Sequence, residues 1–112
     1  MALIGDLGGV SMEVRVNLQP DKVVLQPIGA INSVTAESFG NVLMAAIEQN
    51  QVPIELDLAE VPYASSAAFR VLLIAIQKLD QRRQRLRLSK VPHLVSKALD
   101  TANFTSLVDV VG

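Results

Sequence analysis

Two stretches near the start of the chain alternate apolar and polar residues with a period of two, which is typical of half-buried β-strands. They cover residues 12–18 and 22–28, and the Gln-Pro-Asp sequence at 19–21 between them has turn chemistry. The pattern predicts an antiparallel hairpin. Pro27 has no backbone N–H to donate, so we expect it at a strand end or at an unpaired edge position.

Residues 36–48 carry apolar side chains at helical spacing and predict an amphipathic helix. Ser33 or Thr35 can cap it. Residues 53–58 then alternate again, and this strand–helix–strand order implies a right-handed crossover with parallel pairing. The apolar arc of the helix comprises Phe39, Val42, Leu43, Ala46 and Ile47, and the polar arc comprises Glu37, Ser38, Asn41 and Glu48.

A second helix is predicted from about residue 67 to residue 79, with serines before it at positions suited to caps. Residues 85–89 predict a further strand, Pro92 suits the first turn of a third helix that runs to about residue 102, and residues 107–111 predict a short last strand. The core face of the second helix comprises Ala68, Leu72, Ala75, Ile76 and Leu79. The predicted order is β-β-α-β-α-β-α-β, a mixed α/β fold with a sheet of four to five strands.

Chain length and composition are those of one packed domain. The 112 residues are 50% hydrophobic and 19% charged, and we expect an N-terminal extension over 1–11 and a single domain over 12–112. The absence of cysteine excludes a disulfide framework, a thiolate zinc site and a cysteine nucleophile. The longest apolar run, Val71–Ile76, is too short to cross a bilayer, and the N-terminus has no signal-peptide pattern. We therefore expect a cytoplasmic protein without membrane insertion.

Charge is unevenly placed along the chain, although the formal net charge is only −1. Residues 1–69 hold two basic and eight acidic side chains, whereas residues 70–112 hold eight basic and three acidic ones. The arginines cluster at Arg82, Arg83, Arg85 and Arg87. A solvated turn and a charge-protected edge strand account for them, with a docking site for an acidic partner as the alternative. Nucleic acid is not expected, because no aromatic residues are interleaved and the pI is about 5.7.

Catalytic, metal and cofactor chemistry find no support in the sequence. The one histidine, His93, follows a proline at a predicted helix start, where an exposed or capping role is expected. No G-x-S-x-G elbow surrounds any serine, and one histidine with scattered carboxylates makes no ligand cluster. No glycine-rich phosphate loop follows a predicted strand. We expect a non-enzymatic protein without cofactor or metal.

The second predicted helix has an apolar residue on its polar side. Ile74 falls in the same sector as Arg70, Gln77 and Lys78. Two interpretations stay open: a neighbouring segment covers Ile74, or Ile74 forms a small apolar patch, rimmed by Arg70 and Lys78, that is offered to a partner protein.

The segment Val61-Pro-Tyr-Ala-Ser-Ser-Ala-Ala-Phe-Arg-Val-Leu-Leu73 resembles the signature V-x-F-[LM]-D-S-[ST]-[GA]-L-x-x-L-L of the STAS family, the bacterial anti-sigma-factor antagonists and their relatives. Upstream, residues 29–33 (Gly-Ala-Ile-Asn-Ser) resemble the family's G-E-[LIV]-D segment. Downstream, residues 88–104 resemble V-x-x-x-P-x-V-x-x-x-[LF]-x-x-x-[GN]-[LF]. The resemblance implies a sheet with helices packed mainly on one face.

In that family the serine after the motif's Asp is the phosphoacceptor, which corresponds to Ser66 here. Ser65 then stands at the Asp position, and Asn32 replaces an earlier Asp. Ala67 and Ala68 also depart from the pattern, at the second Ser/Thr and at the usual Gly. Since a one-residue gap would shift the register, Ser65 and Ser66 both stay candidates.

The resemblance implies an antagonist that binds an anti-sigma factor when unphosphorylated and is released when phosphorylated. The implied partners are an anti-sigma factor or serine kinase with a histidine-kinase-like ATPase fold and a PP2C-type phosphatase, and the protein itself is expected to be a monomer or dimer. Two alternatives are a non-phosphorylated subunit of a phospholipid-transport ABC complex and a stressosome-type scaffold. The predicted partner-binding residues are Asn32, Ser33, Tyr63, Ser65, Ser66, Ala67, Arg70 and Ile74.

Overall fold

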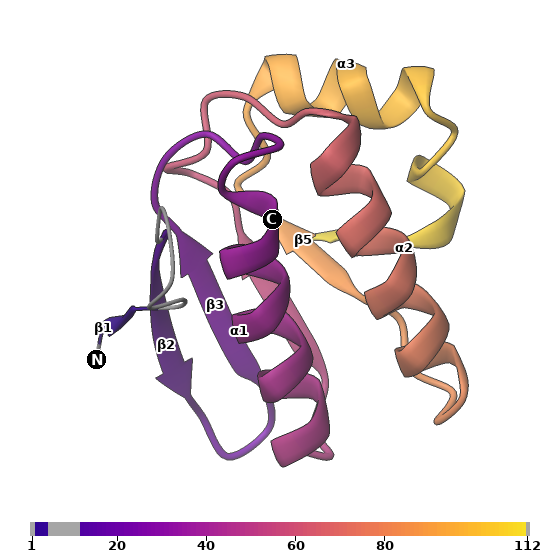
Figure 1. The fold of residues 1–112 in the computed structure, drawn as a ribbon. Coiled ribbons are helices and arrows are strands. Elements are labelled where there is room, and N and C mark those ends of the chain that lie inside the picture. Colours follow the sequence, from indigo (N-terminus) through magenta and orange to yellow (C-terminus); the bar gives the residue numbers. More distant parts are fainter. Residues whose placement is uncertain (1, 5–11, 112) are drawn as a thin grey trace.

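The computed structural model describes residues 2–4 and 12–111 as a sheet with helices packed against it (Figure 1). Its strands are β1 (Ala2–Ile4), β2 (Glu13–Leu18), β3 (Val23–Pro27), β4 (Ile54–Asp57), β5 (Arg87–Ser89) and β6 (Asp109–Val111). Its helices are α1 (Ala36–Gln49), α2 (Ser66–Asp80) and α3 (His93–Thr101), and a 3₁₀ turn, η1 (Thr105–Leu107), precedes β6. Every predicted helix and strand is present.

The order of the strands across the sheet is the same as their order in the sequence. β1 and β2 pair antiparallel, as do β2 and β3, whereas β3, β4, β5 and β6 pair parallel. The predicted hairpin and the parallel crossover are confirmed, and Pro27 closes β3 as expected. The mixed α/β class is also confirmed. The sheet has six strands rather than four or five, because the predicted N-terminal extension contains β1; the rest of that extension lies outside the described residues.

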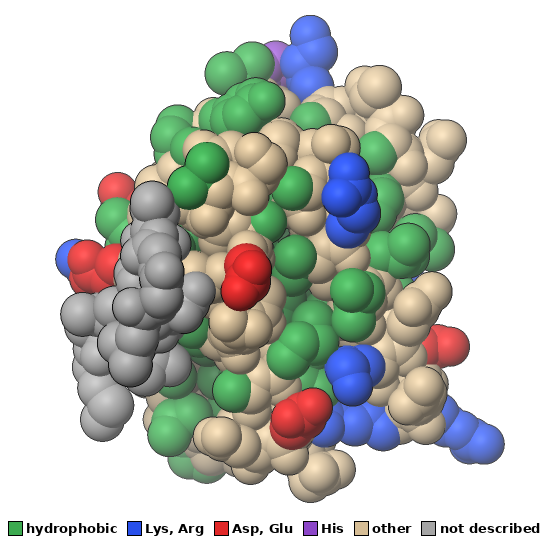
Figure 2. All heavy atoms as spheres, in the orientation of Figure 1, with side chains coloured by type: hydrophobic (Ala, Val, Ile, Leu, Met, Phe, Trp, Pro, Cys, Tyr) green, Lys and Arg blue, Asp and Glu red, His purple; other side chains and the backbone are tan. Residues whose placement is uncertain are grey.

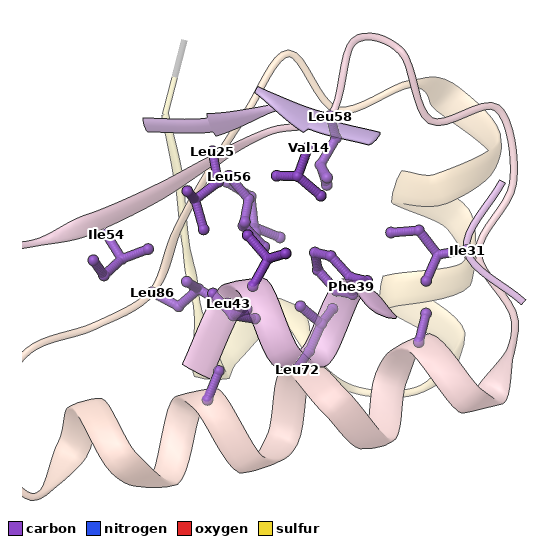
Figure 3. Packing of buried hydrophobic residues seen from close by; sticks show 14 of the residues in the cluster. Val14, Leu25, Ile31, Phe39, Leu43, Ile54, Leu56, Leu58, Leu72 and Leu86 are labelled. Atoms are coloured by element: carbon purple, nitrogen blue, oxygen red, sulfur yellow. The ribbon is translucent and has the colours of Figure 1, made fainter. Parts of the chain in front are cut away.

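The core lies between the helices and one face of the sheet. Figure 3 shows strand residues Val14, Leu25 and Leu56 on one side of the cluster and helix residues Phe39 and Leu43 on the other. α1 buries all five residues of its predicted apolar arc. α2 buries Ala68, Leu72, Ala75 and Leu79, and Ile76 is partly buried against them. The periodicity therefore identified the buried faces of both long helices.

Some polar positions differ from the expectation. Ser38, assigned to the polar arc of α1, is 1% exposed, and its hydroxyl accepts a hydrogen bond from the Met12 N–H at 2.9 Å. Met12, the residue before β2, lies against this side of α1. Pro92 lies just before α3 rather than in its first turn, because its backbone is still extended (ψ 154°) and the helix begins at His93.

Two members of the arginine cluster form hydrogen bonds that link separate segments of the chain. Half-buried Arg82 donates from Nη1 to the Ile47 carbonyl at 2.8 Å and so ties the turn after α2 to the last turn of α1. Arg85 donates to the Asp109 carboxylate at 2.8 Å and to the carbonyls of Ser106 and Val108, which anchors the chain entering β6. The expectation of a solvated turn is therefore wrong for Arg82, whereas Arg85 stays exposed to solvent.

The sheet face away from the core is polar. β4 places Glu55 and Asp57 there, where Lys22 Nζ lies 3.1 Å from a Glu55 oxygen and Lys90 Nζ lies 3.7 Å from an Asp57 oxygen. The Asp57 carboxylate also accepts a hydrogen bond from the Ala59 N–H at 3.0 Å, which shapes the chain as it leaves β4. Both carboxylates are thus nearly buried but paired, as buried charges must be.

Candidate protein-binding site

The loops that follow β3 and β4 run side by side at the same end of the sheet. Three backbone hydrogen bonds join them: Gly29 N–H to the Glu60 carbonyl, Ile31 N–H to the Tyr63 carbonyl and Ser65 N–H to the Ile31 carbonyl, at 2.9 to 3.0 Å. Ile31 and Ala64 accordingly form an isolated parallel bridge. Since α1 follows the first loop and α2 the second, this pairing brings the two helix N-termini together (Figure 1).

Asn32 organises the entry into α1. Its Oδ1 accepts hydrogen bonds from the N–H groups of Val34 (2.9 Å) and Thr35 (3.1 Å), and the Thr35 hydroxyl in turn accepts from the Asn32 N–H at 3.0 Å. The Ala36 N–H already bonds the Asn32 carbonyl in the helical manner. This reciprocal arrangement has the form of a capping box. Thr35 is the N-cap residue of α1, as one of the two predicted alternatives had it, but its side chain makes no capping hydrogen bond. The Asn32 side chain instead binds the N–H groups of the turn that leads into the helix.

The two serines at the start of α2 have different roles. Ser65 is the N-cap residue, and its hydroxyl accepts a hydrogen bond from the Ala67 N–H at 3.3 Å. Ser66 is the first helical residue and is exposed, and its side chain forms no hydrogen bond with any residue that the structure describes. One serine therefore caps the helix, and the other presents its hydroxyl to solvent beside the positive end of the helix dipole.

An exposed stripe continues from Ser66 along α2. Arg70, Leu73 and Ile74 follow at helical spacing, and Ile74 is 49% exposed. Of the two interpretations of Ile74, the structure supports the exposed patch. Ala67 is only half-buried on the side toward α1. Figure 2 shows hydrophobic side chains between and over α1 and α2, with acidic side chains over α1 and basic side chains over α2.

The loop pair adds further apolar groups at the head of this stripe. Tyr63 is 55% exposed and Val34 is 57% exposed, and Ser33 beside Val34 is exposed as well. All eight predicted partner-binding residues thus lie on the two paired loops or on α2, between Ser66 and Ile74. Val34 and Leu73 were missed. An apolar residue between two polar turn positions was the available signal for Val34.

The described titratable side chains do not converge on this surface. His93 is exposed at the start of α3, and its side chain contacts no described serine or carboxylate through a hydrogen bond or ion pair. Over residues 2–4 and 12–111, no three carboxylate or histidine side chains are grouped so that they could hold a metal ion. Within the same ranges, no helix is both long enough and apolar enough to cross a membrane.

Comparison with known proteins identifies the family. The profile of the STAS domain matches residues 11–111, so the chain belongs to the STAS domain family. BtrV of Bordetella bronchiseptica, which bears the name of a candidate anti-sigma factor antagonist, is 30% identical over 82 residues that cover 73% of this chain and 71% of BtrV.

Two solved structures have the same fold at low sequence identity. An anti-sigma factor antagonist from Mycobacterium paratuberculosis superposes with a TM-score of 0.80 at 16% identity, covering 89% of this chain and 85% of the other. The anti-sigma factor antagonist SpoIIAA, in its unphosphorylated form, gives a TM-score of 0.74 at 16% identity, covering 88% of each chain. The family resemblance noted in residues 61–73 is thereby confirmed.

Alanine substitutions should separate the roles of the two serines. Ser65→Ala removes the acceptor of the Ala67 N–H and should lower the free energy of unfolding by about 1 kcal/mol, whereas Ser66→Ala should change it by less than about 0.5 kcal/mol. Urea denaturation of both variants measures the difference. Equal losses would mean that Ser66 also caps the helix.

Gly29 should be sensitive to substitution for a purely backbone reason. Its φ is +108°, which L-residues rarely adopt, although an added Cβ would meet no atom within 4 Å. Gly29→Ala should therefore cost about 1–2 kcal/mol of stability and weaken the loop pairing. Gly40→Ala is the matched control: Gly40 lies within α1, its Cβ would make ordinary contact with Val71 at 3.4 Å, and the change should be neutral or stabilising.

Proposed function

We propose that this protein is an anti-sigma factor antagonist whose binding to its partner is switched by phosphorylation of Ser66. The observation that carries the proposal is that the two serines at the start of α2 have different roles. Ser65 caps the helix, which leaves the hydroxyl of Ser66 exposed at the head of the stripe formed with Arg70, Leu73 and Ile74. A modification at Ser66 would reach the binding surface without removing a fold-stabilising bond.

Similarity to named relatives supports the same conclusion. BtrV and the M. paratuberculosis protein both carry the name of anti-sigma factor antagonists. The SpoIIAA structure is named as that of its unphosphorylated form, which fits a protein that can be phosphorylated. The role that we propose for this chain, an anti-sigma factor antagonist, is the one that these names share. The choice of Ser66 as the switch rests on the residues of this chain.

Ser66 is the better acceptor of the two serines. Transfer of a phosphoryl group requires a hydroxyl that a kinase can reach, and Ser65 is half-buried with its oxygen engaged by the Ala67 N–H. A phosphate of charge about −1.5 to −2 at Ser66 would sit favourably at the helix N-terminus. Phosphorylation would therefore leave the fold intact.

The phosphate would act on the binding surface in two ways. Arg70 lies one helical turn beyond Ser66, both side chains are exposed, and the Arg70 guanidinium has no ion-pair partner in the described part of the chain. A dianion on Ser66 can pair with Arg70 and so occupy a cation that a partner would otherwise use. It also places strongly bound water at the head of the stripe that ends at Ile74, and docking must remove this water at a cost.

The implied cycle needs other proteins for its chemistry. In this proposal the partner is an anti-sigma factor with a histidine-kinase-like ATPase fold, that protein or a related kinase phosphorylates Ser66, and a PP2C-type phosphatase removes the phosphate. The antagonist acts in the cytoplasm as a monomer or dimer, through a single domain over residues 12–112. It catalyses nothing itself and works by binding.

A phosphate mimic should uncouple binding from stability. Ser66→Asp should weaken the complex with the anti-sigma factor by about 100-fold, because docking then has to desolvate a charge at a cost on the order of 3 kcal/mol. The free energy of unfolding should change by less than about 0.5 kcal/mol. Calorimetric titration and thermal melts measure the two quantities, and Ser106→Asp in η1 serves as a matched control that should bind normally. Full binding by Ser66→Asp would contradict the switch.

Phosphosite mapping of the protein from its own cells tests the modification directly. A single phosphate on Ser66 that varies with growth conditions is the expected result. A phosphate on Ser65 would mean that the N-cap residue of α2, and not Ser66, is the regulatory serine. If no phosphate appears and a transport ATPase co-purifies, the chain is a constitutive subunit instead, and a very large assembly on a sizing column would indicate a scaffold.

The apolar part of the stripe should contribute to affinity. Ile74→Arg should weaken the same complex by about tenfold or more, since it removes apolar contact area and adds a charge, while the melting temperature stays nearly unchanged. Leu18→Arg applies the same change to an exposed residue of β2, and it should leave binding intact. Unfolding of Ile74→Arg would show that Ile74 is part of the core.

A further inference from the structure

A polar hollow of about 260 Å³ lies beyond the C-terminal end of α2, at the opposite end of the helix from Ser66. Because α2 has 15 residues, its two ends are separated by roughly 22 Å. The lining of the hollow is rich in arginine: it comprises Pro53, Arg83, Gln84, Arg85, Arg87 and Asp109. The two surfaces are therefore separate.

Two of the three arginines keep their charge unpaired. Arg85 is held by the Asp109 carboxylate and by two backbone carbonyls, whereas the guanidinium groups of Arg83 and Arg87 have no hydrogen-bond or ion-pair partner among the described residues. The acidic neighbours of Arg87 on the adjacent strands are Glu55 and Asp109, and these pair with Lys22 and with Arg85. The hollow thus has two cations available to a ligand.

The backbone at Arg83 is held in a costly conformation. The N–H groups of Arg83 and Gln84 bond the carbonyls of Asp80 and Leu79, which is the Schellman pattern, and Arg83 takes the left-handed position with φ 59°. Glycine is preferred there, and asparagine is tolerated, as at Asn103 after α3. Lys90 shares the left-handed conformation but gains an ion pair with Asp57. Arg83 gains no such contact within the described chain.

We propose that this hollow binds an acidic segment of a partner protein, with Arg83 and Arg87 pairing the carboxylates of that segment. Charge complementarity supports the choice of ligand, because three arginines and a single carboxylate, Asp109, line the hollow. A protein segment fits better than nucleic acid, because none of the lining residues is aromatic and nothing in the hollow can stack on a base. The site is distant from Ser66, so binding here is independent of phosphorylation and of the proposed function.

The test is an NMR titration of the full chain, ¹⁵N-labelled, at low salt. The probe is an acetylated penta-glutamate peptide, and penta-glutamine peptide, inorganic phosphate and single-stranded oligothymidylate are titrated in parallel. The expected result is that penta-glutamate shifts the amide signals of Gln84, Leu86 and Asp109, binds more tightly than each of the other three probes, and binds the Ser66→Asp variant equally well.

Variants then assign the binding to the two free arginines. Arg83→Gly and Arg87→Gln should each weaken penta-glutamate binding by about tenfold, the loss expected for one charge-assisted hydrogen bond. Arg83→Gly should at the same time raise the melting temperature, because glycine relieves the left-handed strain, so a loss of binding cannot result from unfolding. Lys97→Gln removes an exposed and unpaired cation of α3, and it should change binding by less than about twofold.

Three results would overturn the proposal. The first is an absence of shifts around the hollow with penta-glutamate. The second is an equal loss of binding in Lys97→Gln, which would mean that general charge attraction is responsible. The third is tighter binding of oligothymidylate or phosphate than of the peptide at the same residues, which would assign the hollow to nucleic acid or to a small anion.

Discussion

The backbone pairing between the loops after β3 and β4 is the constraint on which the binding surface depends. A hydrogen bond of this kind contributes only about 1 kcal/mol net, but these three bonds fix the entry of both long helices. Gly29 allows the first loop to turn, through a φ that other residues avoid, and the Ser65 N–H completes the pairing at the start of α2. Without these hydrogen bonds, the backbone would not hold the turn at Asn32 next to the turn at Ser65.

Two of this chain's departures from its family's motif fall at residues that accept hydrogen bonds at the entries to helices. Asn32 and Ser65 stand where the resemblance places Asp, and both still accept hydrogen bonds from the N–H groups of their helix turns. Asn, Asp and Ser are all good caps, so the local geometry survives the exchange. What changes is charge: the turn around Ser66 lacks the carboxylate of the motif, and Arg70 is the charged residue nearest to Ser66 along α2.

The topology turns a division of charge along the sequence into a division in space. The strands have the same order in the sheet as in the chain. The segment 1–69, which has a net negative charge, therefore contains β1 to β4 and α1, whereas the segment 70–112, which has a net positive charge, contains most of α2 and everything after it. The face drawn in Figure 2 follows this division, with acidic side chains over α1 and basic ones over α2. A charged partner would therefore meet a surface that favours one orientation.

The sequence by itself determined the order of the elements and the buried faces of the helices, whereas the exposure of Ile74 was decided by the structure. The first two features depend on periodicity, which is a local property of the chain. The sequence also predicted where the candidate site lies. The apolar positions of the motif align residues 61–73 with the family pattern, and this alignment placed Tyr63, the two serines and Arg70 around the start of α2. Short edge strand β1 escaped notice, since three residues are too few to show a period.

Only the tertiary structure decided which polar groups find partners. Ser38 is buried because β2 begins against α1, Arg82 fastens α1 to the turn after α2, and Asn32 rather than Ser33 or Thr35 organises the helix entry. It also decided that Ser65 is the cap and that Ser66 is free. Each outcome depends on hydrogen bonds whose partners are set by how the backbone packs, and a pattern of apolar and polar letters contains no record of them.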